Sequence, residues 1–296
     1  MVNEGMRLQA SDVAEFSNFV FEKYPAVSAI TFHAVQVGNE AIPFFRQKFF
    51  CAEDFIAELP SSPDEYLSSL GSATRKNLKR HKNRFERDFP SFFYQIHERE
   101  NIREEDLRAI AEMNHARMSL KGKVSHVDEA KIQDNLRLLR ECGAVCLATI
   151  DGKACAGTAL VRIGRSAISR ISAHDPKYDP YRLGILCCYL AICASIERGA
   201  CRFHFGHTRY DYKISLGGRF QPYEHIVVYR SPLHFLLNAH HALKVSMTGY
   251  RLMFIRKLLE SAKSETGIPW KIAYNGLNLW RRIKKKNHDN ELVRQH

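Results

Sequence analysis

The chain has 296 residues, 45% of them hydrophobic and 26% charged, and its net charge is +12. This composition is ordinary for a globular protein, and the length allows two modest domains or one duplicated fold. No run reaches the roughly 18–20 apolar residues of a membrane span, and the N-terminus lacks the apolar segment of a signal peptide. We therefore expect a cytoplasmic protein.

Cysteine and histidine spacing indicates neither a disulfide framework nor a metal site. Cys187 and Cys188 are adjacent, the other six cysteines lie among apolar residues, and no CxxC pair occurs. The fourteen histidines contain no HExxH or similar ligand spacing. We expect buried reduced thiols and no metal, while a cysteine nucleophile paired with a distant histidine stays open without a local signature.

The first predicted elements form an α/β region. Helical spacing of apolar residues runs from Ser11 to Lys23, and the apolar segments 42–50 and 54–59 are expected strands. We assign residues 1–94 to this region and expect it to contribute part of a tandem pair of similar folds.

A strongly basic helix is expected late in this region. Ser62 followed by Pro63 is a helix-start signal, and Gly71-Ser72 divides the following residues into two helices. The second holds seven Lys or Arg residues in RKNLKRHKNRFER. Such charge indicates nucleic acid, an anionic acceptor groove or a membrane face, or simply a solvated surface. No zinc-finger, RRM or KH signature occurs, so sequence-specific nucleic-acid recognition is not expected.

Residues 95–231 show the clearest pattern of predicted helices and strands. The expected elements of this region are helices 102–118 and 127–143, strands 144–150, 154–163 and 166–175, an apolar helix 185–199, a strand 201–206 and a strand 224–230. Asp151-Gly152 is a strong hairpin signal, and Gly143 and Gly199 end helices. This order resembles the core of the GNAT acyltransferases, which implies an α+β fold with a mixed, mostly antiparallel sheet flanked by helices.

Residues 232–296 predict a basic, amphipathic helical extension. After a break at 267–269, Trp270, Tyr274, Leu277 and Trp280 share one helical face and are followed by RRIKKK. This pattern suits a peripheral position on an anionic membrane surface, such as the inner face of the membrane. The other interpretation is a helix packed on the protein core with a solvated basic end.

A turn before the apolar helix is the expected phosphate site. Helix N-termini bind anions through unpaired N–H groups, and Gly184 lets a phosphate approach the backbone. The resemblance implies that acyl-CoA is held by Ser172 and by the turn residues Tyr181, Arg182, Leu183, Gly184 and Ile185. The sequence departs from the usual Q/R-x-x-G-x-G/A loop, and Gly184 alone is also explained as a tight-turn residue.

Three phrases resemble the cellulose-biosynthesis-type (CelD-like) acetyltransferase branch of the GNAT superfamily. They are the basic helix opened by Tyr66-Leu67, the Tyr-x-x-Gly-x-Leu turn at 181–186, and FHFGHTRYDYKISLGG at 203–218. The resemblance covers roughly residues 55–230. His204 stands where relatives often have an acid, and the loop 207–209 departs from their pattern. The phrase Tyr-x-Lys-x-x-x-Gly also resembles the Fem-type transferases, which use aminoacyl-tRNA.

Acyl transfer from a thioester needs a positioned acceptor, a path for its proton and a donor for the departing thiolate. The resemblance places a carbonyl-polarising backbone N–H on strand 166–175. The candidate bases are His174, His204 and Asp211, the candidate acids are Tyr210 and Tyr212, and Lys213 would bind an acidic acceptor or brace a carboxylate. A hydrogen-bonded structural role is the alternative for each.

These observations predict an acyltransferase that moves an acyl group, acetyl in the first instance, from acyl-CoA to an amine or hydroxyl of a polar acceptor. The resemblance implies a saccharide or an envelope or exopolysaccharide precursor. Two alternatives stay open. One is a Fem-type transferase that uses aminoacyl-tRNA, and the other is a non-catalytic membrane-surface adaptor with the same fold.

Overall fold

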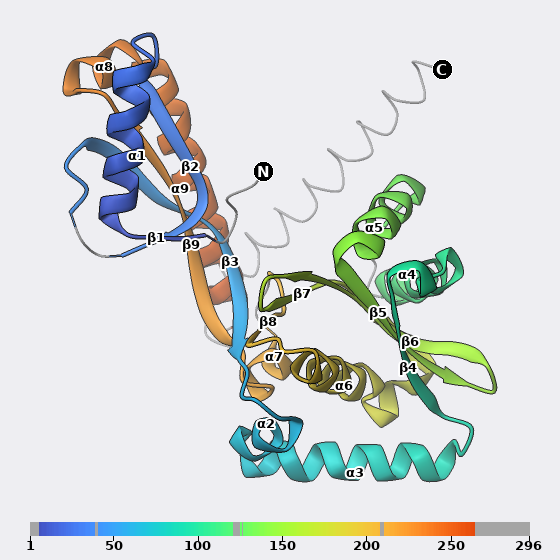
Figure 1. Cartoon of the computed structure of the whole chain (residues 1–296). Coiled ribbons are helices and arrows are strands. Elements are labelled where there is room, and N and C mark those ends of the chain that lie inside the picture. Colours follow the sequence, from blue (N-terminus) through green and yellow to red (C-terminus); the bar gives the residue numbers. More distant parts are fainter. Residues whose placement is uncertain (1–5, 39–40, 121–124, 126, 208–209, 264–296) are drawn as a thin grey trace. The chain divides into compact units, whose positions relative to one another are not determined.

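The computed structural model describes residues 6–38, 41–120, 125, 127–207 and 210–263. Its contacts group the chain into two compact units (Figure 1). Unit 1 combines Met1–Ala52 with Pro222–His296, and unit 2 is Glu53–Gln221. These limits differ from the expected parts 1–94, 95–231 and 232–296, which stay a prediction.

The sheet has nine strands in the order β1-β2-β9-β3-β8-β7-β6-β5-β4. The strands that lie wholly in unit 2 are β4 (Phe93–Glu98), β5 (Gly143–Ile150), β6 (Lys153–Ile163), β7 (Ser166–His174) and β8 (Arg202–His204). Strand β3 (Phe45–Glu58) and strand β9 (Arg219–Tyr229) have residues in both units. Neighbouring strands of unit 2 are antiparallel except β7 and β8, so the sheet is mixed and mostly antiparallel, as predicted.

Helices cover both faces of the unit 2 sheet (Figure 1). Helices α4 (Glu104–Leu120) and α5 (Glu129–Cys142) bury Ile110 and Leu139 against one face. Helix α6 (Leu183–Glu197) lies on the other face with Ile192 fully buried. The remaining helices of unit 2 are α2 (Pro63–Ser69), α3 (Ser72–Asp88), α7 (Asp211–Ser215) and the short 3-10 turns η1 (Arg99–Asn101) and η2 (Pro176–Tyr181).

Local sequence signals explain several of these boundaries. The Ser62 hydroxyl accepts a hydrogen bond from the Glu65 N–H, with Pro63 in the first helical position of α2. The hairpin between β5 and β6 turns at Asp151 and Gly152, both with positive φ, as an Asp-Gly pair favours. Gly143 ends α5 in extended rather than left-handed backbone, because the chain passes directly into β5.

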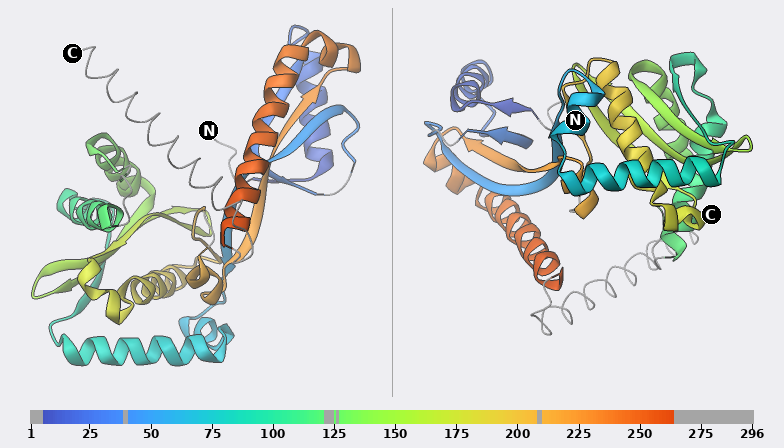
Figure 2. Two further views of the ribbon diagram at one scale, coloured as in Figure 1. Left: turned by 180° about the vertical axis from the view of Figure 1, so that it is seen from behind. Right: turned by 90° about the horizontal axis from the view of Figure 1, so that it is seen from below.

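Unit 1 places one helix on each face of its strands (Figure 2). Its elements are β1 (Arg7–Leu8), α1 (Ala10–Lys23), β2 (Ala29–Val37), parts of β3 and β9, α8 (Pro232–Leu237) and α9 (Ala239–Lys263). Helix α1 packs against the face that carries Ile226 and Val228. Helix α9 packs against the face that carries Val227 and Tyr229. The predicted Trp270–Lys286 face lies outside the described residues.

Candidate functional site

The two parallel strands of unit 2 separate after a short contact. Strands β7 and β8 pair over three positions only, from Ser166–Arg202 to Ile168–His204. Beyond them the Phe205 N–H donates to the Phe55 carbonyl of β3 at 2.9 Å, so the chain leaves β7. Strand β7 continues to His174, paired with β6 on its other side. Among the described strands, none pairs with the free edge of β7 beyond Ile168.

A bulge lies where β7 leaves β8. Strand β6 pairs Ala159 with Ile171 and Leu160 with Ser169, so the exposed Arg170 is an extra residue in β7. Bulges bend a strand and raise its local twist, and they occur often beside active sites. The bulge therefore lies where β7 and β8 separate, beside Ser169 and Gly206, and we call this separation of the strands the β7–β8 cleft, with its apex at these two residues.

The other end of the cleft is the start of α6. Arg182 precedes the helix in left-handed backbone with φ 57°, and no side chain caps the helix. The N–H groups of Ile185 and Leu186 both donate to the Arg182 carbonyl. No described group accepts from the N–H groups of Leu183 and Gly184. They therefore form the positive end of a 15-residue helix, which favours an anion.

His174 lies against this helix start. Its Nε2 is 2.6 Å from Asp179 Oδ1. A Cβ added to Gly184 would lie 2.5 Å from His174 Nδ1, so only glycine leaves room for the ring. His174 is thus placed with the predicted phosphate turn, and its predicted role as a base stays untested.

The basic helix α3 brings positive charge to the same place. The Arg84 guanidinium lies over the Tyr181 ring at 4.5 Å. Burial, together with the neighbouring Arg80 and Arg182, lowers the pKa of His81. The basic helix and the phosphate turn, two separate motifs in the sequence, therefore lie side by side in the fold.

A second polar group surrounds the apex. His204 Nδ1 is 2.7 Å from Asp54 Oδ2, and Asp54 Oδ1 accepts from the N–H groups of Phe55 at 2.7 Å and Gly206 at 2.8 Å. The carboxylate requires a proton on Nδ1, which leaves Nε2 of the neutral ring as an acceptor. Nε2 is buried and has no partner among the described residues. The predicted role of His204 as a base stays a prediction.

Asp54 was not predicted. It lies in the segment 54–59, which the sequence assigned to a strand without a functional role. The available signal was an acidic residue directly before a run of buried apolar residues, because a buried carboxylate needs compensating partners.

Lys213 fixes the loop after β8. Only 2% of the residue is exposed, and Nζ donates to the carbonyls of Gly206 at 2.8 Å and His207 at 2.7 Å. Burial lowers its pKa from 10.5 to about 8, partly offset by the charge of Asp54. In this arrangement the ammonium group braces two backbone carbonyls, and its predicted contact with an acidic acceptor substrate or a carboxylate stays a prediction.

We expect two opposite pH effects from Lys213. Above about pH 8 the neutral amine loses its charge-assisted hydrogen bonds to the loop, so catalysis should decline. The free energy of unfolding should rise between about pH 8 and pH 10.5, because the unfolded chain keeps a proton that the folded chain has lost. Rate profiles and denaturant melts across this range measure both effects. Lys213→Met should abolish both, and an unchanged alkaline limb in this variant would contradict the assignment.

A known protein family matches the part of the chain that holds most of these residues. Residues 72–214 match the family model of an acetyltransferase (GNAT) domain, the CelD-like family that the sequence motifs resemble. Residues 72–214 therefore have the fold of a GNAT domain. The match runs from the first residue of α3 into α7, so the domain contains the β7–β8 cleft, the start of α6 and His204.

Solved structures agree on the fold of the chain. A crystal structure of FemX is 11% identical with a TM-score of 0.56, over 78% of this chain and 82% of that chain. A conserved protein of unknown function from Bacteroides thetaiotaomicron VPI-5482 is 12% identical with a TM-score of 0.50, over 74% of this chain and 76% of that chain. No curated protein matches the chain. The predicted GNAT fold is confirmed.

The GNAT domain thus gathers the predicted residues into two groups. Residues 181–185 and His174 lie at the start of α6, whereas His204 and Lys213 lie at the apex. The groups are six residues apart along β7, which is roughly 20 Å of extended strand. Ser172 lies between them, with its Oγ 3.1 Å from Thr158 Oγ1.

The aromatic and acidic candidates after β8 differ in exposure. Tyr212 packs against the core beside Phe205, and burial raises its pKa. Tyr210 is exposed and its ring stacks on Tyr212 at 6.0 Å. Asp211 is exposed at the first position of α7. The catalytic roles predicted for Tyr212 and Asp211 stay predictions.

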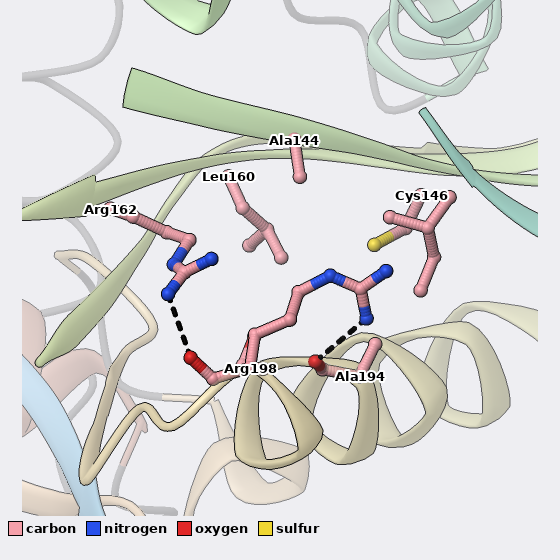
Figure 3. Close-up of a pocket in the computed structure, with 8 residues that line it drawn as sticks. Ala144, Cys146, Leu160, Arg162, Ala194 and Arg198 are labelled. Atoms are coloured by element: carbon pink, nitrogen blue, oxygen red, sulfur yellow. Dashed lines mark hydrogen bonds between the residues drawn. The ribbon is translucent and has the colours of Figure 1, made fainter. Parts of the chain in front are cut away.

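A small cavity at the far end of α6 is separate from the cleft (Figure 3). Its volume is about 10 Å³, room for about one water molecule. Arg198 lines it, with Nε 2.6 Å from Glu98 Oε1, while Arg162 donates to the Arg198 carbonyl at 2.7 Å. These contacts attach the C-terminal end of α6 to β4 and β6, so the cavity is a structural feature of the GNAT domain.

The cysteines nearest the core are poor nucleophiles. Cys187 and Cys188 are buried residues of α6, and Cys146 is a buried residue of β5. Burial raises the pKa of the Cys146 thiol to about 11 and that of Cys188 to about 12. A thiolate is the reactive form, so these three thiols are packing residues. The described residues hold no cluster of three metal-ligating side chains, and no described helix has both the length and the apolar character to cross a membrane.

Proposed function

We propose that this GNAT domain transfers an acyl group, acetyl in the first instance, from acyl-CoA to an amine or hydroxyl of a polar acceptor. The observation that carries the proposal is the splayed β7 edge, which leads to the uncapped start of α6. One end of the cleft offers N–H groups and cations to phosphates. Beyond Ile168, strand β7 offers backbone groups that no described strand pairs, and these could bind the extended arm of acyl-CoA. The apex offers the imidazole of His204, which Asp54 orients.

Different residues along this cleft would bind the phosphates and polarise the thioester. The N–H groups of Leu183 and Gly184, with Arg182 and Arg84, are placed to bind the phosphates of acyl-CoA. A backbone N–H of β7 near the apex would polarise the thioester carbonyl.

At the apex, His204 is the proposed general base. His204 Nε2 would take the proton from the acceptor as its nitrogen or oxygen bonds to the carbonyl carbon. The carbon–sulfur bond then breaks, and the departing thiolate takes a proton from Tyr210 or Tyr212, the predicted acids.

For the acceptor we propose a saccharide, such as an envelope or exopolysaccharide precursor. The CelD-like motifs support this choice. A thiol-release assay with acetyl-CoA over amino sugars, sugar hydroxyls, peptides and polyamines tests it. The expected result is turnover with a sugar, and turnover with peptides alone would overturn the saccharide. Calorimetry that shows no binding of acyl-CoA of any chain length would overturn the acyltransferase itself.

One observation favours aminoacyl-tRNA as an alternative donor. The cations of α3 are exposed except for the half-buried Arg75, and Lys76, Lys79 and Lys82 add to the positive surface of the helix that carries Arg84. Only Lys82 of these three approaches an acid within α3, at 3.8 Å from Glu86. A gel shift with charged tRNA at moderate salt separates the two donors, since binding only of acyl-CoA removes this alternative.

Arg84 should contribute directly to donor affinity. We expect Arg84→Ala to weaken acyl-CoA binding about 5- to 30-fold and to reduce its salt dependence, because a charge-assisted contact is worth roughly 1–2 kcal/mol. Calorimetry at two salt concentrations measures this. Arg137→Ala is the matched control, since that side chain is 78% exposed on α5 and pairs only locally with Asp134. Equal affinity of both variants would remove α3 from the donor site.

A further inference from the structure

Helix α9 of unit 1 has a second apolar face that its packing does not use. Its inner face holds Ala242 and Val245 against the strands. Gly249 allows close approach there, since an added Cβ would lie 2.6 Å from the Phe49 ring. The helix is therefore held firmly by one side, and the direction of its other side is fixed.

The outer face forms a continuous apolar stripe. Its members, which we call the α9 stripe, are Leu243, Met247 and Tyr250, spaced by four and three residues and 62%, 64% and 69% exposed. Spacing of this kind places side chains on one side of a helix. Three leucines of α8 add to the exposed apolar surface. Leu233 is 61% exposed, Leu236 is 65% exposed and Leu237 is 73% exposed. Apolar side chains gathered in this way mark a site of interaction.

Positive charge borders the stripe. Lys244 and Arg251 are exposed, and each directly follows a member of the stripe in the sequence, so it lies about 100° further round the helix. From His225 to Leu259 the sequence has no Asp or Glu. No described acid pairs with Lys244 or Arg251.

We propose that the α9 stripe docks on the surface of an anionic lipid membrane. An apolar stripe bordered by cations is the arrangement of a helix that lies in the membrane plane. The stripe is roughly 10 Å long, and its tyrosine suits the boundary between headgroups and acyl chains. A second copy of the chain is a poorer partner, because pairing of two stripes would bring like charges together without an acid to offset them. After Lys263 the sequence adds two tryptophans and RRIKKK, which extend the same chemistry.

Vesicle flotation of the full chain tests the proposal. The wild type should float with vesicles of three parts phosphatidylcholine and one part phosphatidylglycerol, and weakly with phosphatidylcholine alone. Met247→Glu with Tyr250→Glu should lower the partition coefficient at least tenfold. Lys244→Gln and Arg251→Gln should each lower it roughly fivefold on anionic vesicles only. The matched control is Leu120→Glu on α4, where the leucine is 75% exposed, and it should float like the wild type.

Several outcomes would overturn the proposal. They are no flotation of the wild type, flotation that the Met247/Tyr250 pair does not affect, and a dimer in sedimentation that this pair disrupts without any flotation. Loss of flotation only when residues 264–296 are removed would assign the lipid contact to that segment instead. Binding of acyl-CoA is measured in parallel, so failure of lipid docking and failure of acyl transfer remain distinguishable.

Discussion

Replacing His204 with asparagine is expected to lower kcat of acyl transfer about 10²- to 10³-fold while the KM for acyl-CoA changes little. The imidazole is oriented by Asp54, and its Nε2 is the buried acceptor at the apex of the cleft. A positioned base contributes roughly 10²- to 10⁴-fold to such reactions. The donor phosphates would bind roughly 20 Å away along β7, so donor binding should not depend on this ring.

The split between kcat and KM separates a role in catalysis from a role in packing. Loss of the base lowers kcat alone, whereas a disturbed fold would also raise the KM for acyl-CoA. Asp54→Asn should also lower kcat, since an amide at this position no longer fixes the tautomer. His115→Asn, an exposed histidine on α4, is the control. A kcat within threefold of the wild type in His204→Asn would exclude this histidine as the base.

Gly184→Ala is expected to disrupt the start of α6 although alanine favours helices. Alanine gains about 1 kcal/mol over glycine inside a helix, but its Cβ would lie 2.5 Å from the His174 ring. Overpacking of this kind costs roughly 1–3 kcal/mol, so the variant should melt earlier and bind acyl-CoA at least tenfold more weakly. Gly184→Trp should abolish acyl-CoA binding.

A double-mutant cycle tests the cause. His174→Ala removes the ring that the new methyl group meets, so Gly184→Ala in that background should recover most of the lost stability. Thermal melts and calorimetry of the four proteins give the coupling energy. Gly71→Ala serves as the control, because no atom lies within 4 Å of its added Cβ. Equal losses from Gly184→Ala in both backgrounds would rule out the clash.

The sequence predicted the element order well, because most of its signals are local. Ser62, Pro63 and the Asp151-Gly152 pair act within a few residues of themselves, and each appears where expected. The segments 42–50 and 54–59 were expected as separate strand segments. They lie in one strand, β3, because the residues between them contain no turn former.

The candidate site was predicted only in part, because its key contacts are distant in sequence. Asp54 and His204 are 150 positions apart and meet through the pairing of β3 with β8. His174 was predicted as a candidate base. Its ring lies against Gly184, a packing relation that periodicity does not encode. The approach of α3 to the predicted phosphate turn is likewise a contact between residues that are distant in sequence.

In the proposed donor site, the splayed edge of β7 accounts for a turn at residues 181–185 that departs far from the common phosphate-loop pattern. A ligand held by main-chain N–H groups makes few demands on side-chain identity, so mutation can erase the motif while the cleft survives. The fold persists at 11–12% identity to its solved relatives. Evolutionary change in substrate specificity should therefore concentrate in the side chains at the apex. A search for distant homologues should give backbone structure more weight than a consensus sequence motif.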